Sequence, residues 1–217
     1  MKRILLTLTF IISTLVSFSQ TDSTKIYYKN IEDRNLRTIC DLSDIQIEKI
    51  FCNDTLLRGK VFNVIIKEFK KGKVNSTKNL NISAEKQQIP MVVNGDTLIY
   101  EIDYTDKTGF GNSTESLTLT FAGILKKDKF KLKIEYPGVG ITQELNGKEN
   151  YSLRAINSSS DNIKVPVNNE FPILAYTPPF DTGSGLNSYC MLGEESVLDW
   201  YEKFKVKHYY VIYLEIK

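Results

Sequence analysis

The sequence predicts a mainly β protein, an antiparallel β-sandwich or open barrel with one C-terminal helix before the last strand. Three observations support this: segments in which apolar and polar residues alternate, glycine-containing turns between them, and a single segment with helical spacing. We expect one β-rich domain over residues 20–217, preceded by a signal peptide over residues 1–19.

Four segments predict strands. The segments 129–136 and 116–121 alternate strictly, with apolar residues on one face and mostly polar residues on the other. Such alternation is typical of an antiparallel strand that is buried on one side only. The segments 61–69 and 98–104 are also rich in apolar residues and are predicted as strands.

Four turns are predicted in or beside these strands. Asn94-Gly95 and Asn146-Gly147 are each expected to form a two-residue hairpin, because Asn and Gly tolerate positive φ angles. The segments 70–72 and 126–128 are expected to reverse the chain as well.

The last 24 residues carry many aromatic side chains. Residues 194–204 predict a helix, with an apolar stripe formed by Val197, Trp200, Tyr201 and Phe204. The strand that follows is apolar on both faces, so it should lie centrally in a sheet or be covered on each side. We expect this region to stabilise the whole domain. In the alternative, its aromatic surface is exposed and Tyr209 and Tyr213 bind a ligand by stacking on sugar rings.

The N-terminus has the layout of a secretory signal peptide. Lys2 and Arg3 precede a short apolar run, Ile4–Val16, and Ser17 and Ser19 are small residues before a cleavage site at Gln20. We therefore expect a soluble, exported protein, periplasmic or extracellular, with no membrane span.

The charge balance argues against a nucleic-acid partner. The chain has 28 basic and 26 acidic residues, and two of the basic ones, Lys2 and Arg3, leave with the signal peptide. The remaining protein is formally neutral, so no basic excess remains to bind a phosphate backbone.

Three cysteines, Cys40, Cys52 and Cys190, would enter an oxidising compartment. Cys40 and Cys52 are close in sequence and are the candidate disulfide, although sequence alone does not fix connectivity. The alternative is that all three are small buried apolar residues.

A short stretch resembles the active-site motif of the aspartic proteases. Phe180 is followed by Asp181-Thr182-Gly183-Ser184, and Asp181 is the catalytic candidate of this motif. The resemblance implies an acid protease in which two aspartates share a proton.

The context of that motif does not fit the family. The sequence contains no second Asp-Thr-Gly, Pro178 and Pro179 stand where an apolar strand would lie, and only 36 residues follow Asp181. We expect a turn here, in which the Asp181 side chain caps backbone N–H groups.

Other chemistry leaves no recognisable pattern. The sequence predicts no metal site and no cofactor, because His208 is the single histidine and the chain has no glycine-rich nucleotide loop. A pair of carboxylates acting on a glycoside has no local signature and stays open.

These observations favour a non-catalytic module that binds a protein or glycan partner at the cell envelope. The alternatives are a hydrolase, either aspartic-protease-like at residues 181–184 or a carboxylate-pair glycosidase, and a structural component of the envelope.

Overall fold

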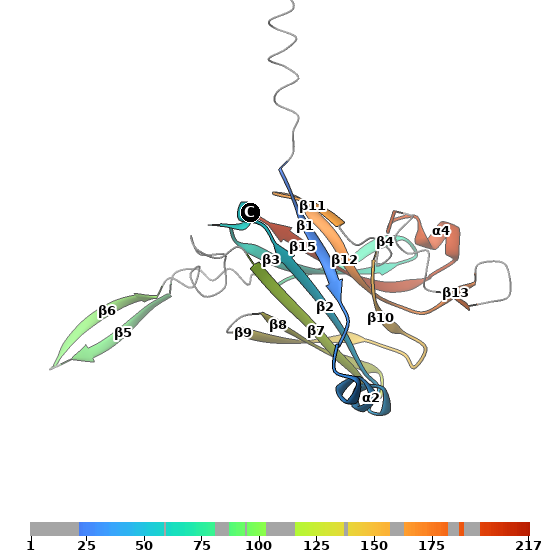
Figure 1. Cartoon of the computed structure of the whole chain (residues 1–217), viewed down its shortest axis with the longest axis horizontal. Helices are drawn as coiled ribbons and strands as arrows, with labels where there is room; N and C mark the ends of the chain where they lie inside the picture. The colour runs from blue at the N-terminus through green and yellow to red at the C-terminus, as the bar shows by residue number, and fades with distance from the viewer. Residues whose placement is uncertain are drawn as a thin grey trace, which may run out of the picture.

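The structure is a computed structural model. It describes residues 22–58, 60–80, 87–93, 95–102, 116–136, 139–156, 163–181, 187–188 and 196–217. Two large antiparallel sheets pack face to face around one core, and of two further two-stranded sheets one, formed by residues 87–93 and 96–102, lies away from them (Figure 1). The predicted fold class is confirmed: the chain is mainly β, with antiparallel sheets and a short helix before the last strand.

The larger sheet has six strands in the order β11-β1-β2-β7-β8-β9. The bounds are β11 Ile163–Pro166, β1 Ser23–Lys29, β2 Ile45–Asn53, β7 Ser116–Lys126, β8 Lys129–Tyr136 and β9 Val139–Asn146.

The second sheet has five strands in the order β10-β12-β15-β3-β4. The bounds are β10 Ser152–Ala155, β12 Glu170–Thr177, β15 His208–Ile216, β3 Phe62–Lys70 and β4 Lys73–Asn79. As expected, the last strand, β15, lies in the centre of its sheet.

The main core lies between the sheets and follows the predicted alternation. Strand β8 alternates exposed and buried residues along its whole length, and Phe130, Leu132 and Ile134 point into the core. Ile212 and Leu214 of β15 meet them from the opposite sheet. Each large side chain buried in this way contributes about 1.5–3 kcal/mol.

A second cluster covers the outer face of β15. Tyr209 and Val211 point away from the main core and pack with Trp200 of helix α4, Trp200–Phe204. The Tyr209 ring stacks on Phe69 at 4.9 Å and lies 5.1 Å from the Trp200 ring. The Tyr209 hydroxyl donates to the carbonyl of Val197, which ties the turn before α4 to the sheet.

The helices differ from expectation in length and position. Helix α4 begins at Trp200, and Glu194 and Glu195 lie outside the described residues. An additional helix, α2, spans Arg34–Leu42 and is capped by the Asp33 carboxylate. A 3₁₀ turn, η1, spans Thr55–Leu57. Over the described part of the chain, no helix combines the length and the apolar character needed to cross a membrane.

Three of the four predicted turns form hairpins. Strands β3 and β4 join at Lys71-Gly72, and β7 and β8 join at Lys127-Asp128, with Lys71 and Lys127 in the left-handed region. Strands β5 (Gln87–Val93) and β6 (Asp96–Ile102) form the predicted hairpin, in which Gly95 has a φ of 90°.

The predicted hairpin at Asn146-Gly147 is wrong. Strand β9 pairs with β8, whereas β10 pairs with β12 in the other sheet. The chain therefore crosses between the sheets here, and Leu145 and Leu153 approach the core from opposite sides. The local Asn-Gly signal cannot report which strand the chain meets next.

Replacing Trp200 should test whether the C-terminal region stabilises the domain. Because Trp200 is fully buried, we expect Trp200→Ala to lower the free energy of unfolding by about 3–5 kcal/mol. Urea denaturation followed by circular dichroism measures this. Leu198→Ala is the matched control, since Leu198 is exposed in the adjoining turn and should change stability by less than about 0.5 kcal/mol. Equal free energies of unfolding for wild type and Trp200→Ala would contradict a stabilising role.

Candidate functional site

The protease-like motif lies in a short two-stranded element. Strand β13 (Phe180–Asp181) pairs with β14 (Asn187–Ser188), and Phe180 packs in the second cluster. The side chain of Asp181, together with residues 182–186, lies outside the described residues. Asp181 as a catalytic residue therefore stays a prediction.

The two tyrosines proposed as ligand-stacking residues are not on the surface. Tyr209 is fully buried and Tyr213 is only 8 % exposed, both in the cluster on the outer face of β15. The structure corrects that expectation, because α4 and its neighbours cover the face on which sugar rings would stack.

The candidate disulfide is not formed. Cys40 and Cys52 are free and buried, and Cys190 lies outside the described residues. Cys40 lies on α2, next to the start of β2. Cys52 lies seven residues beyond Ile45, the first residue of β2, and is therefore roughly 23 Å from that end of the strand at 3.3 Å per residue. The Cys52 thiol instead contacts the Thr24 hydroxyl at 3.3 Å.

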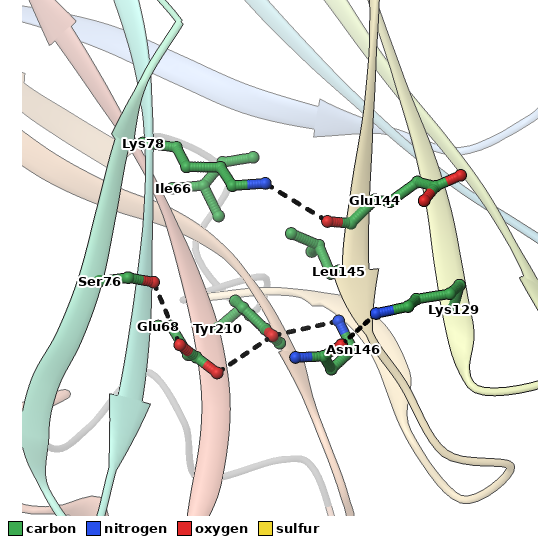
Figure 2. A pocket seen from close by; sticks show the side chains of 9 residues that line it. All are labelled: Ile66, Glu68, Ser76, Lys78, Lys129, Glu144, Leu145, Asn146 and Tyr210. Atoms are coloured by element: carbon green, nitrogen blue, oxygen red, sulfur yellow. Dashed lines mark hydrogen bonds between the residues drawn. The ribbon is translucent and has the colours of Figure 1, made fainter.

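A polar pocket lies where β4 and β9, the edge strands of the two sheets, face each other. Figure 2 shows side chains of β3, β4 and β15 on one side and of β8 and β9 on the other. The cavity has a volume of about 230 Å³, and Ile66 and Leu145 supply its apolar lining. Its polar lining comes from Glu68, Ser76, Lys78, Lys129, Glu144, Asn146 and Tyr210.

The line along which β4 and β9 face each other is called here the seam between the sheets. Hydrogen bonds that involve side chains span it, in place of backbone pairing between the two strands. The Lys78 ammonium donates across the gap to the main-chain oxygen of Glu144 at 3.4 Å and to the side chain of Gln143 at 3.5 Å. Deeper in the pocket, the main-chain N–H of Asn146 donates to the Tyr210 hydroxyl at 3.1 Å. The Lys78 contacts join the edge strands β4 and β9, and the Asn146 contact joins β9 to the central strand β15 (Figure 2).

Glu68 is the buried charge at the base of the pocket. His208 contacts its carboxylate through Nε2 at 3.0 Å, the Tyr210 hydroxyl donates to it at 3.3 Å, and Asn75 and Ser76 donate from β4. Burial acts to raise the pKa of Glu68, but the hydrogen bonds from His208, Asn75 and Ser76 outweigh it and lower the pKa to about 2.

This geometry suits binding better than proton transfer. A carboxylate with a pKa near 2 stays ionised at neutral pH and is a weak base, so Glu68 accepts hydrogen bonds without taking up a proton. The phenol of Tyr210 is held in its neutral form, because burial raises its pKa. The sequence offered no local signal for the site, since Glu68 and His208 are 140 residues apart.

A second cavity, of about 360 Å³, lies beside the first half of β2. Within the described chain, β1 pairs only with the second half of β2. The first half of β2 instead faces β10, a strand of the other sheet, across a second seam. The Gln46 side chain accepts from the main-chain N–H of Leu153 and donates to the carbonyl of Tyr151. Glu48 faces the same seam, where it accepts a hydrogen bond from the backbone of Ala155.

The pKa of Glu48 moves in the opposite direction from that of Glu68. Burial raises it to about 7, against the smaller effects of the Arg154 charge and the Ala155 backbone hydrogen bond. Asp41 and Arg37 line the same cavity. A carboxyl that titrates near neutral pH in a cavity is a common feature of catalytic sites, although buried structural carboxyls share it.

No group of three or more His, Cys, Asp or Glu side chains that could hold a metal ion occurs among the residues that the structure places.

The raised pKa of Glu48 predicts a pH dependence of stability. The protonated form is favoured in the folded state, so its stabilising effect is complete below about pH 4.5 and is lost as the pH rises through about 7. Glu48→Gln stays neutral, so its urea midpoint should exceed that of wild type at about pH 7.5 and converge with it at about pH 4.5. Glu68 is present in both proteins, so the loss of its contribution as the pH falls from about 4.5 toward 2 cancels in the comparison.

Glu135→Gln is the control for that experiment, since Glu135 is an exposed residue paired with Lys133 on β8. Its urea midpoint should follow that of wild type at both pH values. A Glu48→Gln difference that is the same at both pH values would show that Glu48 is not the titrating group.

No family model matches this chain, and neither a curated protein nor a solved structure shows significant similarity to it.

Proposed function

We propose that the chain is an exported, non-catalytic binding module that takes a glycan partner at the cell envelope, in the pocket between β4 and β9. The observation that carries this is the set of hydrogen-bonding groups that converge on the pocket from both sheets: two ammonium groups, an amide, two hydroxyls and an ionised carboxylate. Export rests on the signal-peptide layout of residues 1–19.

The charge of the pocket favours a neutral ligand. Lys78 and Lys129 bring two positive charges and Glu68 brings one negative charge, whereas the Glu144 carboxylate points away from the cavity (Figure 2). A strongly anionic ligand would meet the Glu68 carboxylate, and a strongly cationic one would meet the two ammonium groups. A saccharide hydroxyl both donates and accepts, so it can bond to the carboxylate and the ammonium groups together.

The size of the pocket sets the extent of the ligand. Its volume of about 230 Å³ is below the range of about 300–1,000 Å³ that is usual for drug-sized ligands. Ile66 and Leu145 give it an apolar surface against which the carbon face of a ring packs. These features fit a single sugar ring, such as the end of a longer chain.

Calorimetric titration of residues 20–217 with neutral mono- and oligosaccharides tests the proposal. We expect binding to at least one sugar, and we expect Lys129→Ala to weaken it about tenfold, the effect of losing one charge-assisted hydrogen bond. Lys133→Ala is the matched control, because Lys133 lies on the same strand but outside the pocket. The absence of binding across a broad panel, or equal affinity in Lys129→Ala and wild type, would contradict a glycan site here.

A hydrolase is the second candidate, and the observation that favours it is Glu48. This carboxyl titrates near neutral pH in a cavity that Asp41 also lines, which is the pairing of acid and carboxylate that glycoside hydrolysis uses. Its hydrogen bond to the backbone of Ala155 gives Glu48 a structural role as well, so the binding module remains the leading proposal.

An assay with aryl glycosides between about pH 5 and pH 8 separates the two functions. A hydrolase should lose at least about 100-fold in rate in Glu48→Gln, because a positioned general acid contributes that much or more. A binding module should show no turnover in either protein. Turnover that survives Glu48→Gln would exclude Glu48 as the acid.

A further inference from the structure

Lysines are concentrated on the outward face of the six-stranded sheet. Successive strand residues point alternately into the core and out to this face. Four lysines point outward from β7 and β8: Lys126, Lys129, Lys131 and Lys133. On this half of the face, Glu135 pairs with Lys133, and Glu144 of β9 lies directly opposite Lys131. Acids therefore offset part of the positive charge of the β7–β9 half.

The other half of the face, formed by β11, β1 and β2, carries lysines whose charge is not offset. Four lysines point outward from these strands, and we call them the lysine quartet: Lys25, Lys29, Lys49 and Lys164. The outward-facing residues of these three described strands include no acid, and no quartet lysine forms an ion pair with an acid that the structure describes. The neutral overall charge of the chain without its signal peptide does not reveal this local excess.

The quartet consists of two pairs of directly opposed like charges. Lys25 of β1 lies opposite Lys164 of β11, and Lys29 of β1 lies opposite Lys49 of β2. Like charges directly opposite each other on neighbouring strands destabilise a sheet. Residues that break such a local rule of stability are typical of functional sites. A bound anion would replace both repulsions with attraction.

The distance between the two pairs favours a polymer over a small anion. Lys25 and Lys29 are four residues apart on β1, roughly 13 Å at 3.3 Å per residue. A single carboxylate or phosphate group reaches one of the two pairs only. A linear polymer that carries repeated negative charges reaches both pairs when it runs along β1.

The surroundings of the quartet favour an acidic polysaccharide over other polyanions. Tyr27 and Phe51 lie between the two pairs and are half-buried, with ring centroids 4.9 Å apart. The Lys29 ammonium lies 4.8 Å above the Phe51 ring, so that ring face is not free to stack on the bases of a single-stranded nucleic acid. Within these three strands no large apolar side chain is exposed, as insertion into a lipid surface would require. An acidic protein is disfavoured, because lysine is depleted in protein–protein interfaces.

We propose that the lysine quartet binds an acidic polysaccharide, one that carries carboxylates on its repeating units and lies along β1. The four ammonium groups donate charge-assisted hydrogen bonds to these carboxylates. Because the contacts are between charges at the surface, the affinity falls as the salt concentration rises. This site is separate from the pocket between β4 and β9, since no quartet residue lines that pocket.

Two double variants each remove one lysine pair: Lys25→Gln with Lys164→Gln, and Lys29→Gln with Lys49→Gln. The first relieves a repulsion and removes no described side-chain contact, so its urea midpoint should equal or exceed that of wild type. A loss of binding in that variant is then not caused by unfolding. The matched control is Lys131→Gln with Lys133→Gln, which makes the same change of charge on the same face, in the half that contains acids.

Calorimetric titration of residues 20–217 with polygalacturonate gives the test. In about 50 mM NaCl we expect wild type to bind, each quartet variant to bind at least about tenfold more weakly, and the control to bind within about twofold of wild type. Raising NaCl to about 200 mM should weaken binding by wild type more than binding by either quartet variant, because wild type makes more contacts between charges. A single-stranded DNA oligonucleotide and phosphatidylglycerol vesicles, tested in the same way, should bind more weakly than polygalacturonate.

Three results would overturn the inference. Wild type could fail to bind polygalacturonate in about 50 mM NaCl, or bind it no better than the quartet variants do. The control could lose as much affinity as the quartet variants, which would show that binding follows the overall charge of the protein. The quartet could bind the oligonucleotide or the vesicles more tightly than polygalacturonate, which would assign this face to a nucleic acid or to a lipid surface.

Discussion

Burial of both faces of β15 is the constraint on which the rest of this structure depends. Ile212 and Leu214 on one face need an opposing sheet, and Tyr209 and Val211 on the other need a cover. A single sheet exposed on one side meets only half of that requirement. The six-stranded sheet meets the first need and Trp200 of α4 meets the second, so the segment before β15 must fold back over its own sheet.

The pockets follow from the way in which the two sheets meet. Among the strands that the structure describes, none pairs across either seam, and long polar side chains span the gaps. Lys78 reaches from β4 to β9, and Gln46 reaches from β2 to β10. A side chain that spans a gap fills less space than a strand does, so each seam retains a cavity lined by polar groups. The candidate sites are therefore the places where the fold is least regular.

The glutamates of the two seams, one buried and one partly buried, show how the surroundings set the pKa of a carboxyl. Glu68 receives hydrogen bonds from His208, Asn75 and Ser76 and remains charged, whereas Glu48 has fewer donors and titrates near pH 7. Burial acts to raise both pKa values, but the three hydrogen-bond donors and the Lys70 charge lower that of Glu68, whereas only the Arg154 charge and the Ala155 backbone act against burial at Glu48. One seam thus provides a fixed acceptor suited to binding, and the other provides a proton that leaves near neutral pH.

The sequence by itself determined which residues face the core, because alternation along a strand is a local property: β8 follows it residue for residue. It also determined the hairpin at Gly95, where a positive φ is needed. Only the tertiary structure decided strand partners and the candidate sites. Asn146-Gly147 has a good hairpin sequence, yet the chain crosses to the other sheet there. Glu68 and His208 meet only because β3 and β15 pair over long range, and that pairing depends on the burial of whole faces, which no local pattern of residues encodes.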